Sequence, residues 1–466
     1  MVPFVHRLRG WRKRLRGSAW TVLAFASVSS LMPGSPSAAP AKARNVLLVS
    51  IDSLRADRLG CHGNPRAVSP TLDRLAAEGV RFERAMSPTS WTLPAHVTLL
   101  SGQSQRTHQV ITTADRISSR TELLAEVFSR QGYETVGFYS GPFLHPAYGF
   151  DRGMGAYASC LSESTTGLQG KAAWKSSHRD RTNACVEEAF AAWVGRRSGR
   201  PFFAFVHLWD VHFDYIPPEP YASMFDPTYE GPLDGRDIAG HGFPLDAAPR
   251  DLAHLLALYD GELRYTDATI ERLLAALQSK KLLGETLVVV TSDHGEEFLE
   301  HGGKTHQRTL WDEVLHVPLI FWSPGHLPEG QRVSEAVSLA DVAPTIAELA
   351  GFEGPSRAEG RSLVTLIRGA GGTAAPVFAA LYAAGVPRLK LVSLRAGDTK
   401  LIHDPRSGSW MEFDLARDPG EREPLEVGND ELRALLASYL AGESRALAGR
   451  DRGPPGGATP PGLRRA

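Results

Sequence analysis

Cysteine is scarce in this sequence, neither sign of charge is in surplus, and no apolar run is long enough to cross a bilayer. The 466 residues include 3 cysteines and carry a formal net charge of −1. Three cysteines exclude a scaffold held together by disulfides. The balanced charge argues against a nucleic-acid partner, which requires a cationic surplus. With 42% hydrophobic residues, the chain can bury a large core, so we predict a globular protein.

Residues 1–41 have the layout of a secretory signal peptide. A cationic start between Arg7 and Arg16 precedes an apolar run, Ala19–Met32, and small residues follow it. The apolar run is shorter than the roughly 20 residues that span a membrane. We therefore predict cleavage after Ala39 or Ala41 and export to the periplasm or the exterior, with no stable membrane span afterwards. A retained membrane anchor is the alternative.

The three cysteines have different expected fates. Cys61 lies in the segment Leu59–Gly63 and is expected to be a buried free thiol. Cys160 and Cys185 flank a polar stretch, and they can pair in an oxidising compartment. A disulfide also needs a short Cα separation, which a sequence does not supply. The pairing therefore stays open at this point.

Apolar runs alternate with helical patterns over residues 42–375. The expected strands are 45–51, 133–139, 201–207 and 286–291. The expected helices are 70–77, 121–130, 185–194 and 251–278. This alternation is typical of an α/β domain, so we predict a mostly parallel central sheet with helices on both faces.

The pattern changes from residue 376 onward. Short strands are expected at 376–382, 389–394, 399–403 and 410–413, and a helix at 430–440. We interpret residues 376–448 as a small C-terminal subdomain with an antiparallel sheet and a helix. Residues 449–466 are rich in Pro and Gly and are expected to be a disordered tail.

Four segments place polar residues at the end of an apolar strand or at the start of a helix. Each polar residue taken alone can have a non-catalytic role: Asp52 can cap a turn, Thr92 before Pro94 can cap a helix, and His212 can lie on the surface. Together, beyond the carboxyl ends of parallel strands, they indicate a catalytic site. The segments are Ser50–Asp57, Thr92–Gly102, His207–His212 and Thr291–Glu296, the last continuing to His301–His306.

This set of motifs resembles the sulfatase family within the alkaline-phosphatase superfamily, and the likeness covers nearly the whole chain after residue 41. It implies an alkaline-phosphatase-like α/β fold with the small C-terminal sheet that sulfatases carry. The landmarks that carry the resemblance are Pro70–Val80, Leu99–Gly102, Tyr259–Tyr265, Thr291–Glu296, Trp311–Leu319, Asp341–Thr345 and Leu415–Glu421.

The resemblance also implies roles, residue by residue. Thr92 falls where the family places its catalytic residue, two positions before a proline that opens a helix. His212 falls where a family histidine contacts the ester's non-bridging oxygens or its leaving group. One divalent metal ion would be held by Asp52, Thr92, Asp293 and His294. Further candidates for the catalytic, substrate-binding anion pocket are His207, Lys304 and His306.

The nucleophile position departs from the sulfatase pattern. Classical sulfatases oxidise a Cys or Ser in a Cys/Ser-x-Pro-x-Arg signature to formylglycine, but this segment reads Thr92-Leu-Pro-Ala-His96. Oxidation of threonine would give a ketone, so we expect no formylglycine. A threonine-bound ester must be cleaved by water, as in the phosphoryl-transferring relatives of this family.

The metal site departs as well, because Asp52 is followed by Ser53 where sulfatases commonly have paired acidic residues. Ca²⁺ prefers several carboxylates among 6–8 oxygen ligands. Two carboxylates, one imidazole and a threonine oxygen form a mixed set that favours Zn²⁺ or Mn²⁺. Ca²⁺ remains the alternative.

Three functions follow from these residues. The first is hydrolysis of phosphate esters by a metal-activated Thr92, acting on a small-molecule or a glycan- or lipid-linked anionic ester. The second is hydrolysis of sulfuric esters, as in arylsulfatases or choline sulfatases, without formylglycine. The third is a non-catalytic protein that binds anionic glycans or lipids. The sequence indicates no oligomeric state.

Overall fold

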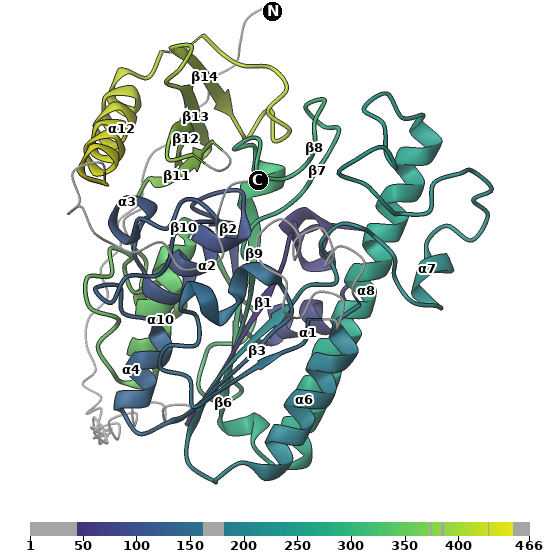
Figure 1. Cartoon of the computed structure of the whole chain (residues 1–466), viewed down its shortest axis with the longest axis vertical. Helices are drawn as coiled ribbons and strands as arrows, with labels where there is room; N and C mark the ends of the chain where they lie inside the picture. Colours follow the sequence, from purple (N-terminus) through teal and green to yellow (C-terminus); the bar gives the residue numbers. More distant parts are fainter. Residues whose placement is uncertain (1–43, 162–180, 373–374, 384–385, 427, 451–466) are drawn as a thin grey trace, which may run out of the picture. The chain divides into compact units, whose positions relative to one another are not determined.

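The computed structural model describes residues 44–161, 181–372, 375–383, 386–426 and 428–450 (Figure 1). The predicted signal peptide and the predicted tail beyond residue 450 lie outside these residues. None of the helices formed by the described residues combines the length and the apolar character that a membrane crossing needs.

A mixed eight-stranded sheet forms the centre of the fold (Figure 1), in the order β10-β2-β9-β6-β1-β5-β3-β4. All neighbouring strands are parallel except β9, which is antiparallel to both β2 and β6. The mostly parallel sheet expected from the sequence is therefore confirmed. The strands are β1 (Asn45–Ile51), β2 (Val80–Met86), β3 (Glu134–Tyr139), β4 (Ala156–Ser159), β5 (Phe202–Leu208), β6 (Thr286–Ser292), β9 (His316–Trp322) and β10 (Gln331–Ser338).

Helices cover both faces of this sheet (Figure 1). In β1, Val46 and Leu48 belong to one hydrophobic core, while Leu47 and Val49 belong to the other, because successive side chains of a strand point to opposite faces. The first core includes residues of α2 (Thr92–Ser101), α4 (Leu124–Arg130) and α10 (Val342–Ala350). The second includes residues of α1 (Pro70–Glu78), α6 (Asn183–Arg196) and α8 (Pro249–Ser279).

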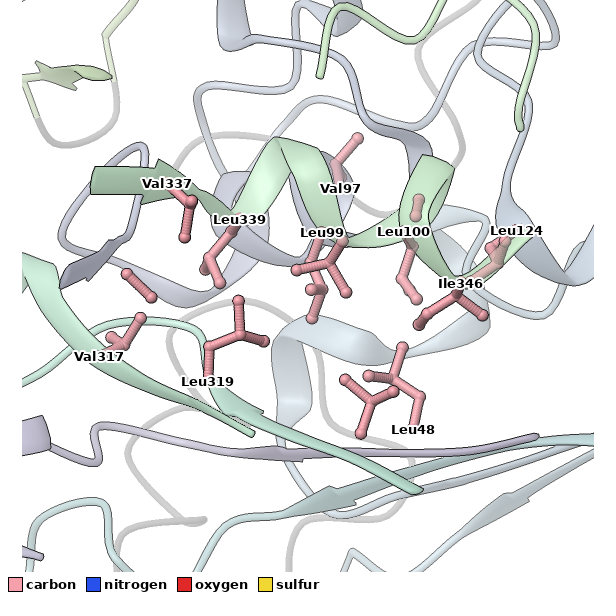
Figure 2. Close-up of a cluster of buried hydrophobic side chains, with 14 of the residues drawn as sticks. Leu48, Val97, Leu99, Leu100, Leu124, Val317, Leu319, Val337, Leu339 and Ile346 are labelled. Atoms are coloured by element: carbon pink, nitrogen blue, oxygen red, sulfur yellow. The ribbon is translucent and has the colours of Figure 1, made fainter. Parts of the chain in front are cut away.

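Helix α2 is enclosed on all sides. All ten of its residues are buried, and its leucines lie among side chains of β9, β10 and α10 (Figure 2). Leu99 and Leu100 face Leu319 and Ile346 across this core (Figure 2). The helix ends at Gly102, whose φ of 69° suits glycine. The start of α2 is therefore held in place by the packing of its whole length.

The C-terminal region forms a second, antiparallel sheet with the order β11-β12-β13-β14. Helix α12 (Asp430–Arg450) packs on this sheet, with Leu436 against Val392 and Leu394. The expected strands and helix are confirmed, and α12 extends past its predicted end at residue 440. The strands are β11 (Val377–Tyr382), β12 (Leu389–Ala396), β13 (Thr399–Asp404) and β14 (Ser409–Asp414).

Two small elements complete the region near the site. Strands β7 (Glu297–Phe298) and β8 (Lys304–Thr305) form a short hairpin after β6.

Two details differ from the sequence predictions. The helix expected at 121–130 begins later, at Leu124. Cys61, expected to be buried, is only partly buried, because its loop lines a surface cavity.

Cys160, which follows β4, forms a disulfide with Cys185 in α6. Their Cα atoms are 5.7 Å apart, within the range that a disulfide requires. The pairing left open by the sequence is thus made in the structure. The bridge attaches the edge of the sheet to a helix that covers it.

Removing this disulfide is expected to lower the free energy of unfolding. The cysteines are 25 residues apart, and the loop-closure entropy of such a crosslink corresponds to about 3.5 kcal/mol. We expect the double variant Cys160→Ala/Cys185→Ala to show this loss in urea unfolding followed by fluorescence. The matched control is Cys61→Ala, whose midpoint should change little. A double variant as stable as the parent would show that the bridge does not constrain the unfolded chain.

Candidate active site

The register of the parallel strands places the candidate residues at one edge of the sheet. Ile51 at the end of β1 is paired with Leu208 of β5 and with Ser292 of β6. The next residues of β1 and β6, Asp52 and Asp293, therefore leave neighbouring strands side by side. The backbone N–H of Asp52 also donates to the carbonyl of Leu208 at 2.9 Å.

Ser53 connects the two aspartates. Its φ of 56° turns its backbone N–H toward Asp293, to which it donates at 3.2 Å from Oδ1. Its hydroxyl donates to Oδ1 of Asp52 at 2.9 Å. The residue that replaces the paired acid of sulfatases therefore orients both carboxylates without adding a third negative charge.

Thr92 is the first residue of α2 and is 1% exposed. Its hydroxyl donates to Oδ2 of Asp52 at 3.3 Å, and Oγ1 lies 3.3 Å from Nε2 of His294. The free backbone N–H groups at the start of a helix carry partial positive charge that attracts anions. The hydroxyl therefore lies where an anionic ester would be drawn to it.

The donor set of this cluster fits a divalent cation. The ligand atoms of Asp52, Asp293 and His294 lie within 4.8 Å of one another, and all three side chains are fully buried. Nδ1 of His294 donates to the carbonyl of Gly295 at 2.9 Å, which leaves a lone pair on Nε2.

An unpartnered oxygen supports the same conclusion. Oδ2 of Asp293 is buried without a hydrogen-bond partner among the described residues, and it lies 3.3 Å from Nε2 of His294. A buried carboxylate oxygen needs a partner, and a divalent cation between these two atoms would supply one to both. Burial raises the pKa of Asp52 to about 6, against the opposing effect of His294, so the ionised carboxylate also needs a cation.

His96 belongs to the site, although no role was predicted for it. Its Nδ1 donates to the carbonyl of Thr92 at 2.9 Å, and its Nε2 pairs with the hydroxyl of Ser50 at 2.9 Å. Burial lowers the pKa of His96 to about 4, so the ring is neutral at pH 7. The ring therefore braces the first turn of α2 against the end of β1. Its position four residues after Thr92, on the same helix face, is the signal that could have identified it.

His207 lies beside the metal-ligand candidates. Its Nε2 is 3.3 Å from Oδ2 of Asp52, and its Nδ1 is buried without a partner among the described residues. Burial lowers the pKa of His207 to about 4. The neutral ring therefore orients Asp52 rather than carrying positive charge.

His212 and His306 lie next to each other, and His306 lies against the metal-ligand candidate His294. The ring of His212 stacks on Trp209, with centroids 3.8 Å apart, and its Nδ1 donates to the carbonyl of Phe213 at 2.6 Å. The ring of His306 is 5.0 Å from that of His212 and 4.3 Å from that of His294. The structure thus brings both predicted histidines to the site.

Nδ1 of His306 is hydrogen-bonded to Oε1 of Glu296 at 3.0 Å. Burial raises the pKa of Glu296 to about 8 and lowers that of His306 to about 4. The two groups share a hydrogen bond, so they titrate as a pair, and the pair retains one proton at neutral pH.

Lys304 is placed differently. Its ammonium donates to the carbonyls of Gly240 and Phe243, at 2.7 Å and 2.5 Å. Thr305 has a φ of 66°, which interrupts the alternation that would put Lys304 and His306 on one side of a regular strand. The ammonium is thereby engaged with the loop at 240–243, and its part in an anion pocket stays a prediction.

A second group of potential metal ligands consists of Glu297, His301 and Glu313. Both ring nitrogens of His301 already have partners, Oε1 of Glu313 at 2.7 Å and the carbonyl of Glu421 at 3.1 Å. A histidine engaged at both nitrogens has no lone pair for a metal ion. This group therefore connects the β7–β8 hairpin to the C-terminal region by hydrogen bonds.

The family profile described as sulfatase matches residues 44–352, and the profile of the N-sulphoglucosamine sulphohydrolase C-terminal region matches residues 300–441. The chain therefore belongs to the sulfatase family, within the alkaline-phosphatase superfamily. It is an ester hydrolase. The resemblance inferred from the motifs is confirmed.

Curated relatives and solved structures agree with this membership. The arylsulfatase of Clostridium perfringens is 25% identical over 458 residues, covering 85% of this chain and 94% of the relative. Arylsulfatase A of Bos taurus is 28% identical over 402 residues, covering 76% of this chain and 71% of the relative. The fold is similar to that of the phosphonate monoester hydrolase of Agrobacterium radiobacter, with a TM-score of 0.71, 24% identity and coverage of 87% and 95%.

Proposed function

We propose that this sulfatase-family hydrolase uses Thr92 as a nucleophile to cleave phosphate esters. The observation that carries the proposal is the position of the Thr92 hydroxyl, 3.3 Å from both Asp52 and His294 at the start of a helix. The aspartates and His294 orient the hydroxyl, and the helix N-terminus attracts the ester anion.

The reaction has two steps. In the first, Oγ1 of Thr92 forms a bond to phosphorus, its proton passes to water, and the bond from phosphorus to the leaving oxygen breaks. In the second, water forms a bond to phosphorus and loses a proton, and the bond from phosphorus to Thr92 breaks. The alkoxide of Thr92 takes back a proton from solvent water, which restores the hydroxyl, and phosphate is released. A covalent intermediate of this kind divides one difficult step into two easier ones.

The residues proposed to hold one divalent ion are Asp52, Thr92, Asp293 and His294. The bound ion would supply positive charge that favours the ionised Thr92 hydroxyl and neutralises the ester oxygens. Two carboxylates with an imidazole favour Zn²⁺ or Mn²⁺ over Ca²⁺.

His212 and His306 are proposed to contact the ester's non-bridging oxygens and its leaving group. The ring of His306 lies against that of His294, and the ring of His212 lies against that of His306, so both are close to the proposed metal ligands without being ligands themselves. His207 supports Asp52, and Lys304 is held by the carbonyls of the loop at 240–243. We propose that the ester is small or is linked to a glycan or a lipid. A 2-O GAG sulfatase has the same fold (TM-score 0.69, 20% identity), and its name refers to a glycan.

Sulfuric ester hydrolysis is the second candidate, favoured by membership of the sulfatase family. Threonine lacks the second hydroxyl with which a formylglycine hydrate expels sulfate, so a sulfated Thr92 would have to be released by water. That step favours phosphate over sulfate. A non-catalytic glycan- or lipid-binding protein is the third candidate, and the complete ligand set at Asp52, Asp293 and His294 argues against it.

Export of the chain is part of the proposal. The cationic and apolar N-terminal layout supports a cleaved signal peptide. The Cys160–Cys185 disulfide supports an oxidising compartment such as the periplasm.

A parallel assay tests the substrate class. Purified protein loaded with Zn²⁺, Mn²⁺ or Ca²⁺ is given p-nitrophenyl phosphate, bis-p-nitrophenyl phosphate and p-nitrophenyl sulfate. We expect kcat/KM for a phosphate ester to exceed that for the sulfate by at least about tenfold, a difference of about 1.4 kcal/mol in the barrier. The reverse order would assign the protein to the sulfuric ester hydrolases. No turnover with any ester would leave the non-catalytic binding protein as the remaining candidate.

A further inference from the structure

Glu296 is a buried carboxylate for which the reaction above has no role. It follows Asp293 and His294 in the loop after β6 and is 0% exposed. Its Oε1 is bonded to Nδ1 of His306 at 3.0 Å, and its Oε2 accepts from the hydroxyl of Tyr215 at 3.0 Å. Burying a carboxyl group is costly unless its oxygens are bonded, and here each oxygen has its own partner. The carboxyl group is therefore fixed in one orientation.

The three residues come from separate parts of the chain. Tyr215 lies in the segment after β5, Glu296 after β6, and His306 after β8. The phenol of Tyr215 also contacts the rings of Tyr259 and Phe298, so it is itself fully buried and held by packing. The chain Tyr215–Glu296–His306 thus runs from the core to the edge of the candidate site.

We propose that Glu296, held by Tyr215, is a positioning residue that directs Nε2 of His306 at the leaving-group oxygen of the ester. The bond from Glu296 occupies Nδ1, so Nε2 is the nitrogen that remains for the substrate, in a ring 4.3 Å from that of His294 and 5.0 Å from that of His212. A carboxyl partner fixes both the orientation and the tautomer of an imidazole. This inference rests on the proposed function of the same site.

The proton transfer balances over the two steps. As the bond from phosphorus to the leaving oxygen breaks, the electron pair stays on that oxygen, and the proton on Nε2 of His306 passes to it. The proton in the hydrogen bond between Glu296 and Nδ1 moves onto Nδ1 at the same time, so the ring stays neutral and Glu296 becomes a carboxylate. In the second step Nε2 takes a proton from the water that attacks phosphorus, and the proton on Nδ1 returns to Glu296, which restores the starting state.

A positioned proton donor defines the substrate class. Leaving groups that are strong acids depart without a proton, whereas alcohols and simple phenols depart poorly unless they receive one. The Glu296–His306 pair therefore suits esters of weakly acidic hydroxyls, such as those of sugars and alkyl alcohols, rather than activated aryl esters.

The test compares two leaving groups. Full-length, metal-loaded wild type and Glu296→Gln are assayed with p-nitrophenyl and phenyl phosphate, or with the two sulfates if the parallel assay selects sulfate. For Glu296→Gln we expect kcat/KM to fall less than about threefold with the p-nitrophenyl ester and about 10- to 100-fold with the phenyl ester. Equal losses with both esters would overturn the proposal, because p-nitrophenol is a much stronger acid than phenol.

Two further variants separate positioning from general damage. Glu297→Gln is the matched control, since Glu297 is an adjacent buried glutamate whose Oε1 instead accepts from the N–H of Gly303 at 2.8 Å. It should leave the ratio between the two esters unchanged. In a His306→Ala background, Glu296→Gln should cause no further loss, and an additional loss would show that Glu296 does not act through His306. If wild type hydrolyses neither ester of either acid, the proposed function itself fails, and this inference with it.

Discussion

Replacing Thr92 with alanine is expected to reduce kcat by about 10³- to 10⁶-fold, the range seen when a catalytic nucleophile is removed. The loss would arise because no other described hydroxyl shares the position of Oγ1 between Asp52 and His294. Thr92→Ser keeps a hydroxyl at the same place and should retain most of the activity. The measurement is steady-state kinetics with the ester selected by the parallel assay.

Folding and chemistry can be separated in this experiment. Thr92 is buried, but the two polar contacts of its hydroxyl are long, at 3.3 Å each, so the alanine variant should lose about 1 kcal/mol of stability or less. Thr98→Ala is the matched control, because Thr98 is a buried threonine of the same helix whose hydroxyl pairs with His108 at 3.2 Å. It should remain active. Mass spectrometry of quenched wild type should find a phosphoryl group on the peptide that contains Thr92.

A Thr92→Ala variant with near-normal kcat would contradict the covalent scheme. The attacking group would then be water, and Thr92 would only help to bind the ion. A variant that loses activity together with its thermal unfolding transition would report a folding defect, and Thr92→Ser would then decide between the two readings.

The second large effect is expected from Asp293→Asn, which should abolish metal binding. Wild type should contain about one divalent ion per chain by elemental analysis after dialysis against the metal, and the variant close to none, since metal ligands must be ionised. At a metal concentration about 1,000 times the Kd, bound metal adds about 4 kcal/mol to wild-type stability. Wild type should therefore unfold at a higher temperature in metal than in a chelator, and Asp293→Asn should not.

In the absence of metal, Asp293→Asn is not expected to lower the stability of the protein. In the metal-free protein, Oδ2 of Asp293 is buried without a hydrogen-bond partner among the described residues, and a neutral amide is less costly to bury than a charge. Asp293→Asn should then be at least as stable as wild type in chelator. The matched control is Asp267→Asn, because Asp267 is an equally buried aspartate that accepts from the N–H groups of Thr71 and Leu72. That variant should lose stability and keep the ion. Equal metal content in wild type and Asp293→Asn would show that Asp293 is not a metal ligand, and the proposed ligand set would be wrong.

The sequence predicted the elements that carry the site because their signals are local. The apolar runs of β1, β5 and β6 mark buried parallel strands, and strands that run parallel must bring the residues after their carboxyl ends together. Asp52 and Asp293 follow directly from that rule. Thr92 followed from the resemblance to sulfatases, which place their catalytic residue two positions before a proline that opens a helix.

Other parts depend on tertiary contacts that leave no local pattern. Strands β2, β9 and β10 were not predicted, and the antiparallel direction of β9 depends on which neighbours it pairs with. Lys304 and His306 could not be distinguished, because only the φ of Thr305 shows that the backbone departs from a regular strand there. Glu296 was visible in the motif, but its partners Tyr215 and His306 are 81 and 10 residues away along the chain.

Helix α2 presents almost no surface to solvent, since every residue from Thr92 to Ser101 is buried. Such a helix gains nothing from forming alone, and its backbone amides should exchange with deuterium only when the whole domain opens. The threonine hydroxyl is consequently presented only by molecules whose core is complete. Only fully native molecules should therefore be active. During denaturation, the remaining activity should be proportional to the fraction of native molecules, and no partly folded form should be active.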